Sequence, residues 1–223
     1  MRIIMIIVMT LCFTNGIFVK GAGGPIELKK KIAITPISDL PFDKGKTVFC
    51  PASSWGYTPE QTFHLPMFLY KDLGLTEKFD DPNATCIICH KFQMSDNFDF
   101  VALDISVSDW SKQLLATYKN GEFIDCIESE VYCVFWFIKQ WRITAEKEII
   151  VTSLNVESST PISGLSDFDK VNAQRIDTYY KVDDSGKFYE TKQVKYRPQV
   201  YTKAYLEDRN KNIWEGDEVP VNG

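Results

Sequence analysis

One short stretch of the chain carries residue types that could do chemistry. Residues 84–92 read ATCIICHKF and hold Cys86, Cys89 and His90 in the C-x-x-C-H spacing by which c-type cytochromes attach haem. That chemistry requires both thiols at one porphyrin edge and the histidine on the iron. The same three side chains could instead supply three of the four ligands of a zinc site, or the two thiols of a redox pair.

The neighbouring residues favour a strand at this position. In c-type domains the motif leads out of a helix, whereas here the chain continues as KFQMSDNFDFVALDISV, which becomes a strand. A strand directs Cys86 and Ile88 to one face and Ile87 and Cys89 to the other. Residues three apart in a strand are about 10 Å apart, too far for a disulfide. We therefore interpret both cysteines as buried, expect no cofactor, and keep a mono-haem electron-transfer protein as the remote alternative.

Two further cysteines could pair with each other. Cys126 and Cys133 flank the stretch IESEVY, and a two-residue hairpin loop at Ser129 and Glu130 would bring them face to face. Facing cysteines can form a disulfide, but they can equally act as small buried hydrophobes. The sequence leaves both interpretations open.

The sequence singles out no catalytic group. The two histidines, His64 and His90, lie near no recognisable nucleophile elbow, and no glycine-rich phosphate loop occurs. Carboxylates are so plentiful that a glycosidase-like pair can be chosen in many ways, and solvated faces and turns account for them equally well. A hydrolase of envelope or dietary polymers is therefore the alternative function. The carboxylates considered are Glu128, Glu130, Asp177, Asp183 and Asp184.

A basic stretch rich in tyrosine is the one candidate for binding. Between residues 187 and 205 five basic side chains stand against a single acid, Glu190, with tyrosines interleaved. Such a mixture can form a stacking platform, and it also suits the outer face of an edge strand. The net charge of −5 argues against nucleic acid, so we expect a glycan or a protein partner. The candidate binding residues are Tyr189, Lys192, Tyr196, Arg197 and Tyr201.

The elements that must position these residues read as antiparallel strands. VALDISV alternates apolar and polar residues, and QLLATYK and EFIDCIE flank Asn120-Gly121, the dipeptide of a type I′ hairpin turn. VYCVFWFI, residues 131–138, is apolar without alternation and predicts a central strand covered on both faces. RIDTYYKV and KFYETKQVKY are joined by a turn at 183–186. The sequence thus predicts one all-β domain, an antiparallel β-meander that forms a sandwich or barrel-like roll.

Helix is scarce in this sequence. The best candidate is TPEQTFHLPMFLYKDLGL, residues 58–75, which Pro66 interrupts. The proline-containing stretch 34–56 is predicted to run as a strap across the domain. We place the domain at residues 23–215 and expect a flexible tail over 216–223.

The amino-terminal residues predict export. Met1-Arg2 precedes the apolar run IIMIIVMTLCF and the small-residue triplet at 14–16, which is typical of a secretory signal peptide. We place this signal at about residues 1–22, with the cut between 16 and 24, and leave open whether the chain is lipid-anchored. The apolar run is shorter than the roughly twenty residues that a membrane-spanning helix needs. We therefore expect a periplasmic or cell-surface protein with no transmembrane segment in its mature chain.

Three segments carry a resemblance to known sequences. They are SDNFDF at a strand start, the hairpin YKNGEFIDCIES, and the ending RIDTYYKVDDSGKFYETKQVKYRPQVYTKAYLEDRNKNIWEGDEVP. Over about the last 130 residues the chain resembles a group of uncharacterised exported proteins of gut Bacteroidota. The resemblance implies export by a diderm bacterium and a β-rich domain, and it assigns no activity and no site residue. We expect a non-catalytic interaction module whose partner the sequence does not identify.

Overall fold

A computed structural model of the chain describes residues 25–43, 62–63, 85–107, 110–133, 136–158, 162, 165–208 and 210–221. The expected signal peptide lies outside these ranges, as does most of the helix expected over 58–75. The part of that segment that is described, Thr62–Phe63, forms a short strand instead. Within the described ranges, no helix is both long and apolar enough to cross a membrane.

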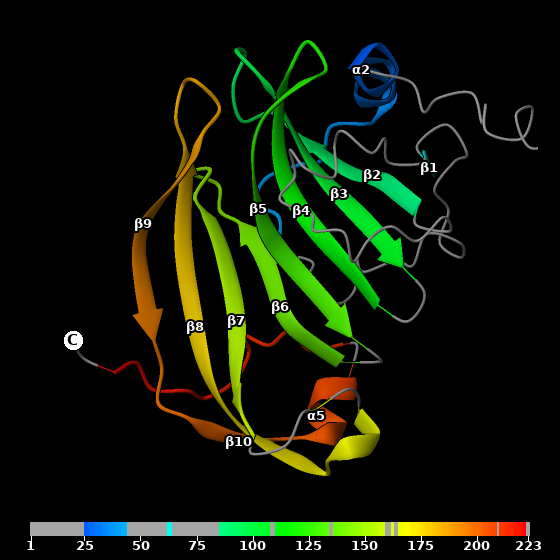
Figure 1. The fold of residues 1–223 in the computed structure, drawn as a ribbon. Coiled ribbons are helices and arrows are strands. Elements are labelled where there is room, and N and C mark those ends of the chain that lie inside the picture. The colour runs from blue at the N-terminus through cyan, green and yellow to red at the C-terminus, as the bar shows by residue number, and fades with distance from the viewer. Residues whose placement is uncertain are drawn as a thin grey trace, which may run out of the picture.

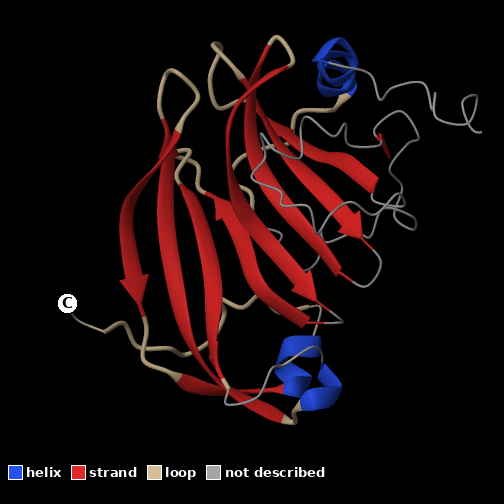
Figure 2. Ribbon diagram, viewed as in Figure 1, coloured by secondary structure: helices blue, strands red, loops and turns tan. Residues whose placement is uncertain are grey.

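The predicted antiparallel β-meander with little helix is confirmed (Figures 1 and 2). Ten strands form one sheet in the order β1-β2-β3-β4-β5-β6-β7-β8-β10, and β9 pairs with the same edge of β8 as β10 does. Among the described residues, the helices are α2 (Pro25–Ile34) and α5 (Lys203–Glu207), and a 3-10 turn, η2, covers Leu165–Asp167. The strands are β1 (Thr62–Phe63), β2 (Thr85–Phe92), β3 (Asp99–Val107), β4 (Trp110–Lys119), β5 (Glu122–Cys133), β6 (Trp136–Ile143), β7 (Ile149–Glu157), β8 (Lys170–Val182), β9 (Phe188–Lys195) and β10 (Gln199–Thr202).

The turn chemistry read from the sequence is also confirmed. Asn120 and Gly121 both have positive φ, 57° and 84°, as a type I′ turn between β4 and β5 requires. At the β8–β9 turn Gly186 has a φ of 90°, and the Asp183 carboxylate accepts hydrogen bonds from the backbone nitrogens of Ser185 and Lys187. Both hairpins therefore follow directly from residues that tolerate or stabilise the turn.

The predicted central strand over residues 131–138 is wrong. β5 runs without interruption through Ser129 and Glu130 to Cys133, and Cys133 then pairs with Trp136 in β6, so the chain reverses inside the apolar run. Ser129 and Glu130, where a Cys126–Cys133 disulfide would need a hairpin loop, are buried residues of β5. Two apolar strand ends that follow each other in sequence have the same hydrophobic pattern as one buried strand. Periodicity therefore cannot distinguish two strands from one here.

The sheet folds back on itself into an open roll. β5 and β6 pair only between Val131–Cys133 and residues 136–139, and beyond this point the two halves of the sheet diverge and face each other (Figure 1). Aromatic rings meet across the space between the halves. Phe92 of β2 lies 5.9 Å from Trp141 of β6, and Phe100 of β3 lies 5.7 Å from Phe188 of β9. The inner face is therefore a packed core, which we call the inner cluster.

A strap and a turn bring the separated halves together. Residues 35–43 run from β2, where the Ser38 nitrogen donates to the Lys91 carbonyl, to β6, where Phe42 and Ile143 exchange two hydrogen bonds of 2.8 and 2.7 Å. The strap predicted over 34–56 is thus seen in this part, and residues 44–56 lie outside the described ranges. On the other side the Gly186 carbonyl accepts from Thr117 Oγ1 of β4.

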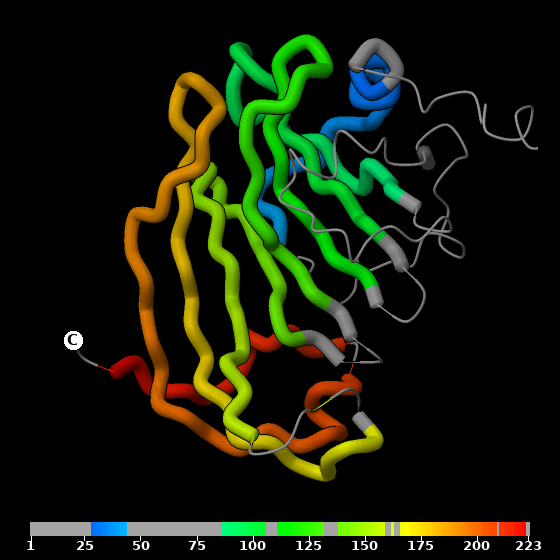
Figure 3. The backbone as a smooth tube through the Cα atoms, viewed as in Figure 1, coloured from blue at the N-terminus to red at the C-terminus, as the bar shows by residue number. Residues whose placement is uncertain are grey.

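Two separate layers cover the outside of the roll. α2 packs Leu28 and Ile32 against the outer face of β2–β4, a contact region that we call the outer cluster. α5 and the following chain bury Leu206 and Ile213 on the outer face of β6–β8. Figure 3 shows the C-terminal segment, in red, continuing across β7, β8 and β9.

The C-terminal segment is held by backbone pairing. The Arg197 nitrogen donates to the Val219 carbonyl at 2.9 Å, and the Val221 nitrogen donates to the Lys195 carbonyl at 2.8 Å. The polar composition predicts a flexible tail from residue 216. Through residue 221 the chain instead lies alongside the end of β9, because polar residues there find backbone and ion-pair partners that hydropathy does not reveal.

Candidate functional site

The C-x-x-C-H residues do not converge on a common point. Cys86 is buried in the outer cluster, whereas Cys89 is buried in the inner cluster, as the strand alternation predicted. A bulge between Ile88 and His90 shifts the ladder and turns His90 toward the strap. There its Nδ1 lies 3.2 Å from Ser38 Oγ and its ring lies 4.7 Å from the Phe42 ring. Across the described residues no three or more histidine, cysteine, aspartate or glutamate side chains are grouped so that they could hold a metal ion.

The disulfide considered between Cys126 and Cys133 would require a hairpin at Ser129 and Glu130, whereas in the structure β5 runs through these two residues. Both residues belong to β5, seven positions apart, which separates them by about 23 Å. Cys126 packs against the outer cluster. Burial and the adjacent Asp125 carboxylate raise the pKa of the Cys126 thiol to about 11, so it is protonated at neutral pH.

The carboxylates considered from the sequence are mostly engaged in structural contacts. Glu128 lies between Lys112 and Lys139 on the outside of β5. Asp177 accepts a two-pronged hydrogen bond from the Arg175 guanidinium, with distances of 3.0 and 2.7 Å. Asp183 belongs to the β8–β9 turn, and the neighbouring Asp184 is exposed. These groups form no pair that could act together on a substrate.

A different carboxyl pair lies on the inner face. Asp104 of β3, Gln113 of β4 and Glu130 of β5 are direct neighbours across the three strands, and their side chains share one face. We call them the inner row. Trp141 Nε1 donates to Gln113 Oε1 at 2.8 Å and thereby fixes the central amide. The sequence pointed to Glu130 only as one of many acids, because the strand register that joins it to Asp104 could not be read from it.

The inner row is enclosed. Asp104 and Glu130 are only 1% and 3% exposed. Burial, and then the charge of Asp104, raise the pKa of Glu130 well above its usual range. A glycosidase must bring two carboxyls to a substrate bond from an open cleft. The enclosed inner row does not present its carboxyls in that way.

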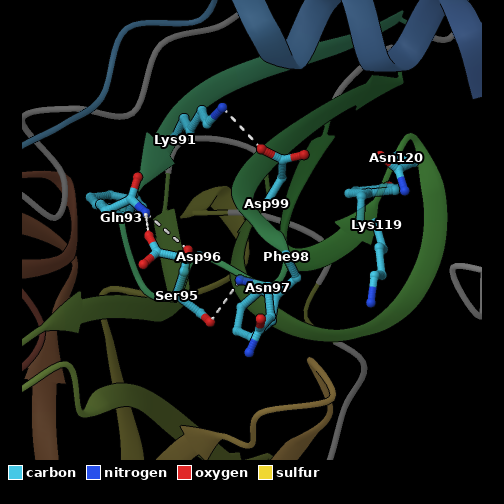
Figure 4. Close-up of a pocket in the computed structure, with 11 residues that line it drawn as sticks. Lys91, Gln93, Ser95, Asp96, Asn97, Phe98, Asp99, Lys119 and Asn120 are labelled. Atoms are coloured by element: carbon cyan, nitrogen blue, oxygen red, sulfur yellow. Dashed lines mark hydrogen bonds and ion pairs between the residues drawn. The ribbon is translucent and has the colours of Figure 1, made fainter.

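A hollow of about 380 Å³ opens at the hairpin end of the roll, between the β2–β3 loop and the β4–β5 turn (Figure 4). Lys91 and Asp99 on its rim form an ion pair of 3.0 Å. Gln93 Nε2 donates to the Ser95 carbonyl and to Asp96 Oδ1 at 2.9 and 3.0 Å. These polar groups bond to one another and stabilise the β2–β3 loop. The polar lining of the hollow is therefore explained by the structure of this loop.

The outer surface of β8 and β9 brings together part of the predicted binding face. Tyr179 pairs with Lys192 and Lys181 pairs with Tyr189, and a bulge at Thr191 takes up the extra residue of β9. Tyr189 and Lys192 therefore lie on the same face although they are three positions apart. Simple alternation would have placed them on opposite faces. The Lys192 ammonium sits 4.0 Å from the centre of the Tyr179 ring.

Tyr196, the residue after β9, extends this surface, and its nitrogen donates to the Arg175 carbonyl of β8. Its ring stacks 4.2 Å from the Arg175 guanidinium and its hydroxyl donates to Asp177 Oδ2 at 3.2 Å. Tyr189 is 47% exposed, Lys192 is exposed and Tyr196 is half-buried. We define the outer β8–β9 face by residues Tyr179, Lys181, Tyr189, Lys192 and Tyr196.

Two of the predicted binding residues lie elsewhere. Arg197 is exposed but follows the end of β9, where its backbone pairs with Val219. Tyr201 is 2% exposed, and its hydroxyl donates to the buried Glu218 carboxylate, so it belongs to the core beneath α5. Three of the five candidates therefore share one accessible face.

Comparison of the chain with protein-family models, with curated proteins and with solved structures gives no match. The functional argument therefore proceeds from the geometry of the outer β8–β9 face and of the inner row.

Proposed function

We propose that this chain is an exported, non-catalytic interaction module of a bacterial envelope and that its outer β8–β9 face binds an acidic glycan. The observation that carries the proposal is the bulge at Thr191, which places the exposed residues Tyr189 and Lys192 on one face of the sheet. A tyrosine ring can stack against the apolar face of a sugar, and a neighbouring ammonium can pair with a carboxylate on the same sugar.

The charge distribution supports an acidic ligand at this face. The whole chain carries a net charge of −5, yet the two charged side chains that define the outer β8–β9 face, Lys181 and Lys192, are both basic and exposed. A local basic surface on an acidic protein directs an anionic partner to that surface. Nucleic acid concentrates one negative charge in about every 1.7 Å of helix, which suits strongly basic proteins. A glycan with one carboxylate per sugar has a lower charge density and fits a face with two exposed lysines.

The enclosure of the inner row supports binding rather than hydrolysis. The two acids of the inner row, Asp104 and Glu130, are almost completely shielded. Glu128 and Asp177 are engaged in ion pairs, and Asp183 is engaged in the β8–β9 turn. The accessible feature is an aromatic and basic surface, which is typical of a binding module.

The proposal is tested by calorimetric titration of the mature protein with polygalacturonate and, as a neutral comparison, with dextran. Tyr189→Ala and Lys192→Ala are each expected to weaken polygalacturonate binding about 3- to 10-fold, or about 0.6 to 1.4 kcal/mol. Lys30→Ala, which removes an exposed lysine of α2, is the matched control and should bind like the wild type. Added salt should weaken binding, because the contact is charged and exposed. Equal binding by all variants, or none by the wild type, would overturn the proposal.

A further inference from the structure

The inner row contains buried polar atoms whose hydrogen-bonding capacity is unused. Glu130 Oε1 is fully buried and has no hydrogen-bond partner in the described structure. Ser111 Oγ, two positions from Gln113 on the same face of β4, is buried and also lacks a partner there. Ser111 is 4% exposed and Gln113 is 3% exposed. Buried polar atoms in folded proteins nearly always have partners, so two such atoms on one face need an explanation, and a bound ion is one such explanation.

We propose that the inner row, together with Ser111, is a binding site for a hard divalent cation, with Ca²⁺ as the fitting ion. The donors are the carboxylates of Asp104 and Glu130, the Ser111 hydroxyl, and the Gln113 carbonyl oxygen, which Trp141 orients. All are oxygens, the ligand type that Ca²⁺ prefers, whereas zinc and copper select nitrogen and sulfur. Ca²⁺ accepts variable geometry, which suits donors spread over three neighbouring strands better than the strict octahedron of Mg²⁺.

The energetics of the row also favour a bound cation. An acid buried beside a second acid destabilises a fold unless a positive charge or hydrogen bonds compensate. Glu130 makes no ion pair in the described part of the chain, whereas Glu128, two residues away on the opposite face of β5, is paired with two lysines. A glutamine or an apolar residue would fill the Glu130 position at lower cost. The carboxylate is explained if it serves to hold a cation.

The site is tested by thermal unfolding of the mature protein in EDTA and in excess Ca²⁺, after overnight equilibration because the row is enclosed. We expect saturating Ca²⁺ to raise the melting temperature of the wild type by several degrees, with a smaller effect of Mg²⁺. Glu130→Gln and Asp104→Asn should abolish the response. Glu128→Gln, the same change on the opposite face of the same strand, should retain it.

Two further measurements distinguish the loss of Ca²⁺ binding from misfolding of the variant. Glu130→Gln should unfold in EDTA at the wild-type temperature or above, because it removes a buried acid, so its lost response would not reflect misfolding. Calorimetric titration with CaCl₂ should give one site per chain in the wild type and none in Glu130→Gln. A wild type without a Ca²⁺ response, or a Glu130→Gln variant that responds like the wild type, would overturn the site and leave a buried water in the row. Neither result bears on glycan binding at the outer β8–β9 face.

Discussion

Glu218 Oε2 of the C-terminal segment lies 3.3 Å from Nη1 of Arg175 in the middle of β8, and the Glu218 side chain is fully shielded from solvent. The same Arg175 nitrogen donates to the Trp214 carbonyl at 2.8 Å, and the Tyr201 hydroxyl donates to the other Glu218 oxygen. One buried carboxylate thus connects the C-terminal segment to β8 and β10. The segment in turn covers Arg175, whose guanidinium organises Asp177 and Tyr196 beside the outer β8–β9 face.

We expect Glu218→Gln to lower the free energy of unfolding by about 1–3 kcal/mol, because it removes the charge that pairs with Arg175 inside the protein. Urea unfolding measures this loss. Hydrogen exchange should also quicken at the amides of Arg197 and Val221, which pair the segment with the end of β9. Asp217→Asn changes an exposed neighbour and is the control, with an expected effect within about 0.5 kcal/mol. Equal stability of the two variants would contradict this account of the segment.

The loss of folding stability at low pH should depend on Asp177. Burial opposes ionisation of this carboxyl, but hydrogen bonds from Arg175 and Thr152 and the charge of Arg175 outweigh burial and lower its pKa. A lowered folded pKa contributes stability that is complete above the unfolded value of about 3.9 and is lost as the pH falls through the folded pKa. Asp177→Asn should therefore be less stable at pH 7 and should lose less stability on acidification. Urea midpoints from about pH 7 to pH 2.5 measure both effects, and parallel curves for the two proteins would contradict it.

The predictable part of the fold is the part in which local chemistry and tertiary structure agree. The alternation in β3, the Asn120-Gly121 turn and the split of Cys86 and Cys89 between two faces all follow from a period of two and from backbone preference. The reversal between Cys133 and Trp136 could not be predicted in this way. Both flanking segments are apolar, and the pattern of one buried strand fits them equally well.

The sites depend on information that is not local. The bulge at Thr191 decides that Tyr189 and Lys192 share a face, and nothing in the KFYETKQVKY stretch marks its position. Likewise Asp104 and Glu130 become neighbours only through the registers of β3 with β4 and of β4 with β5. The composition of the binding face could therefore be predicted from the sequence, whereas the residues that act together required the pairing of strands.

Gly186 should tolerate no side chain. Its φ of 90° disfavours any other residue, and a Cβ there would lie 2.8 Å from Ile124 Cδ1 of β5. Gly186→Ala should lower the free energy of unfolding by about 1–3 kcal/mol. Adding Ile124→Val, which removes the crowded methyl group, should recover part of the loss because only the backbone strain then remains. Chemical unfolding of the single and double variants measures this coupling, and strictly additive effects would show that the close contact does not matter.

The C-x-x-C-H motif should remain free of haem. The two thiols point to opposite faces of β2, with Cys86 0% and Cys89 7% exposed, and His90 is directed toward Ser38 and Phe42. Covalent attachment would require both thiols at one porphyrin edge and the imidazole on the iron, so β2 would have to leave the sheet and expose two buried clusters. We expect the protein purified after export from a host with cytochrome c maturation machinery to be colourless and to show the same visible spectrum as a Cys86→Ala, Cys89→Ala double variant. Alkylation after denaturation should find both thiols free in the wild type. A Soret band that survives acid-acetone extraction and disappears in the double variant would show instead that β2 is not formed when haem is attached.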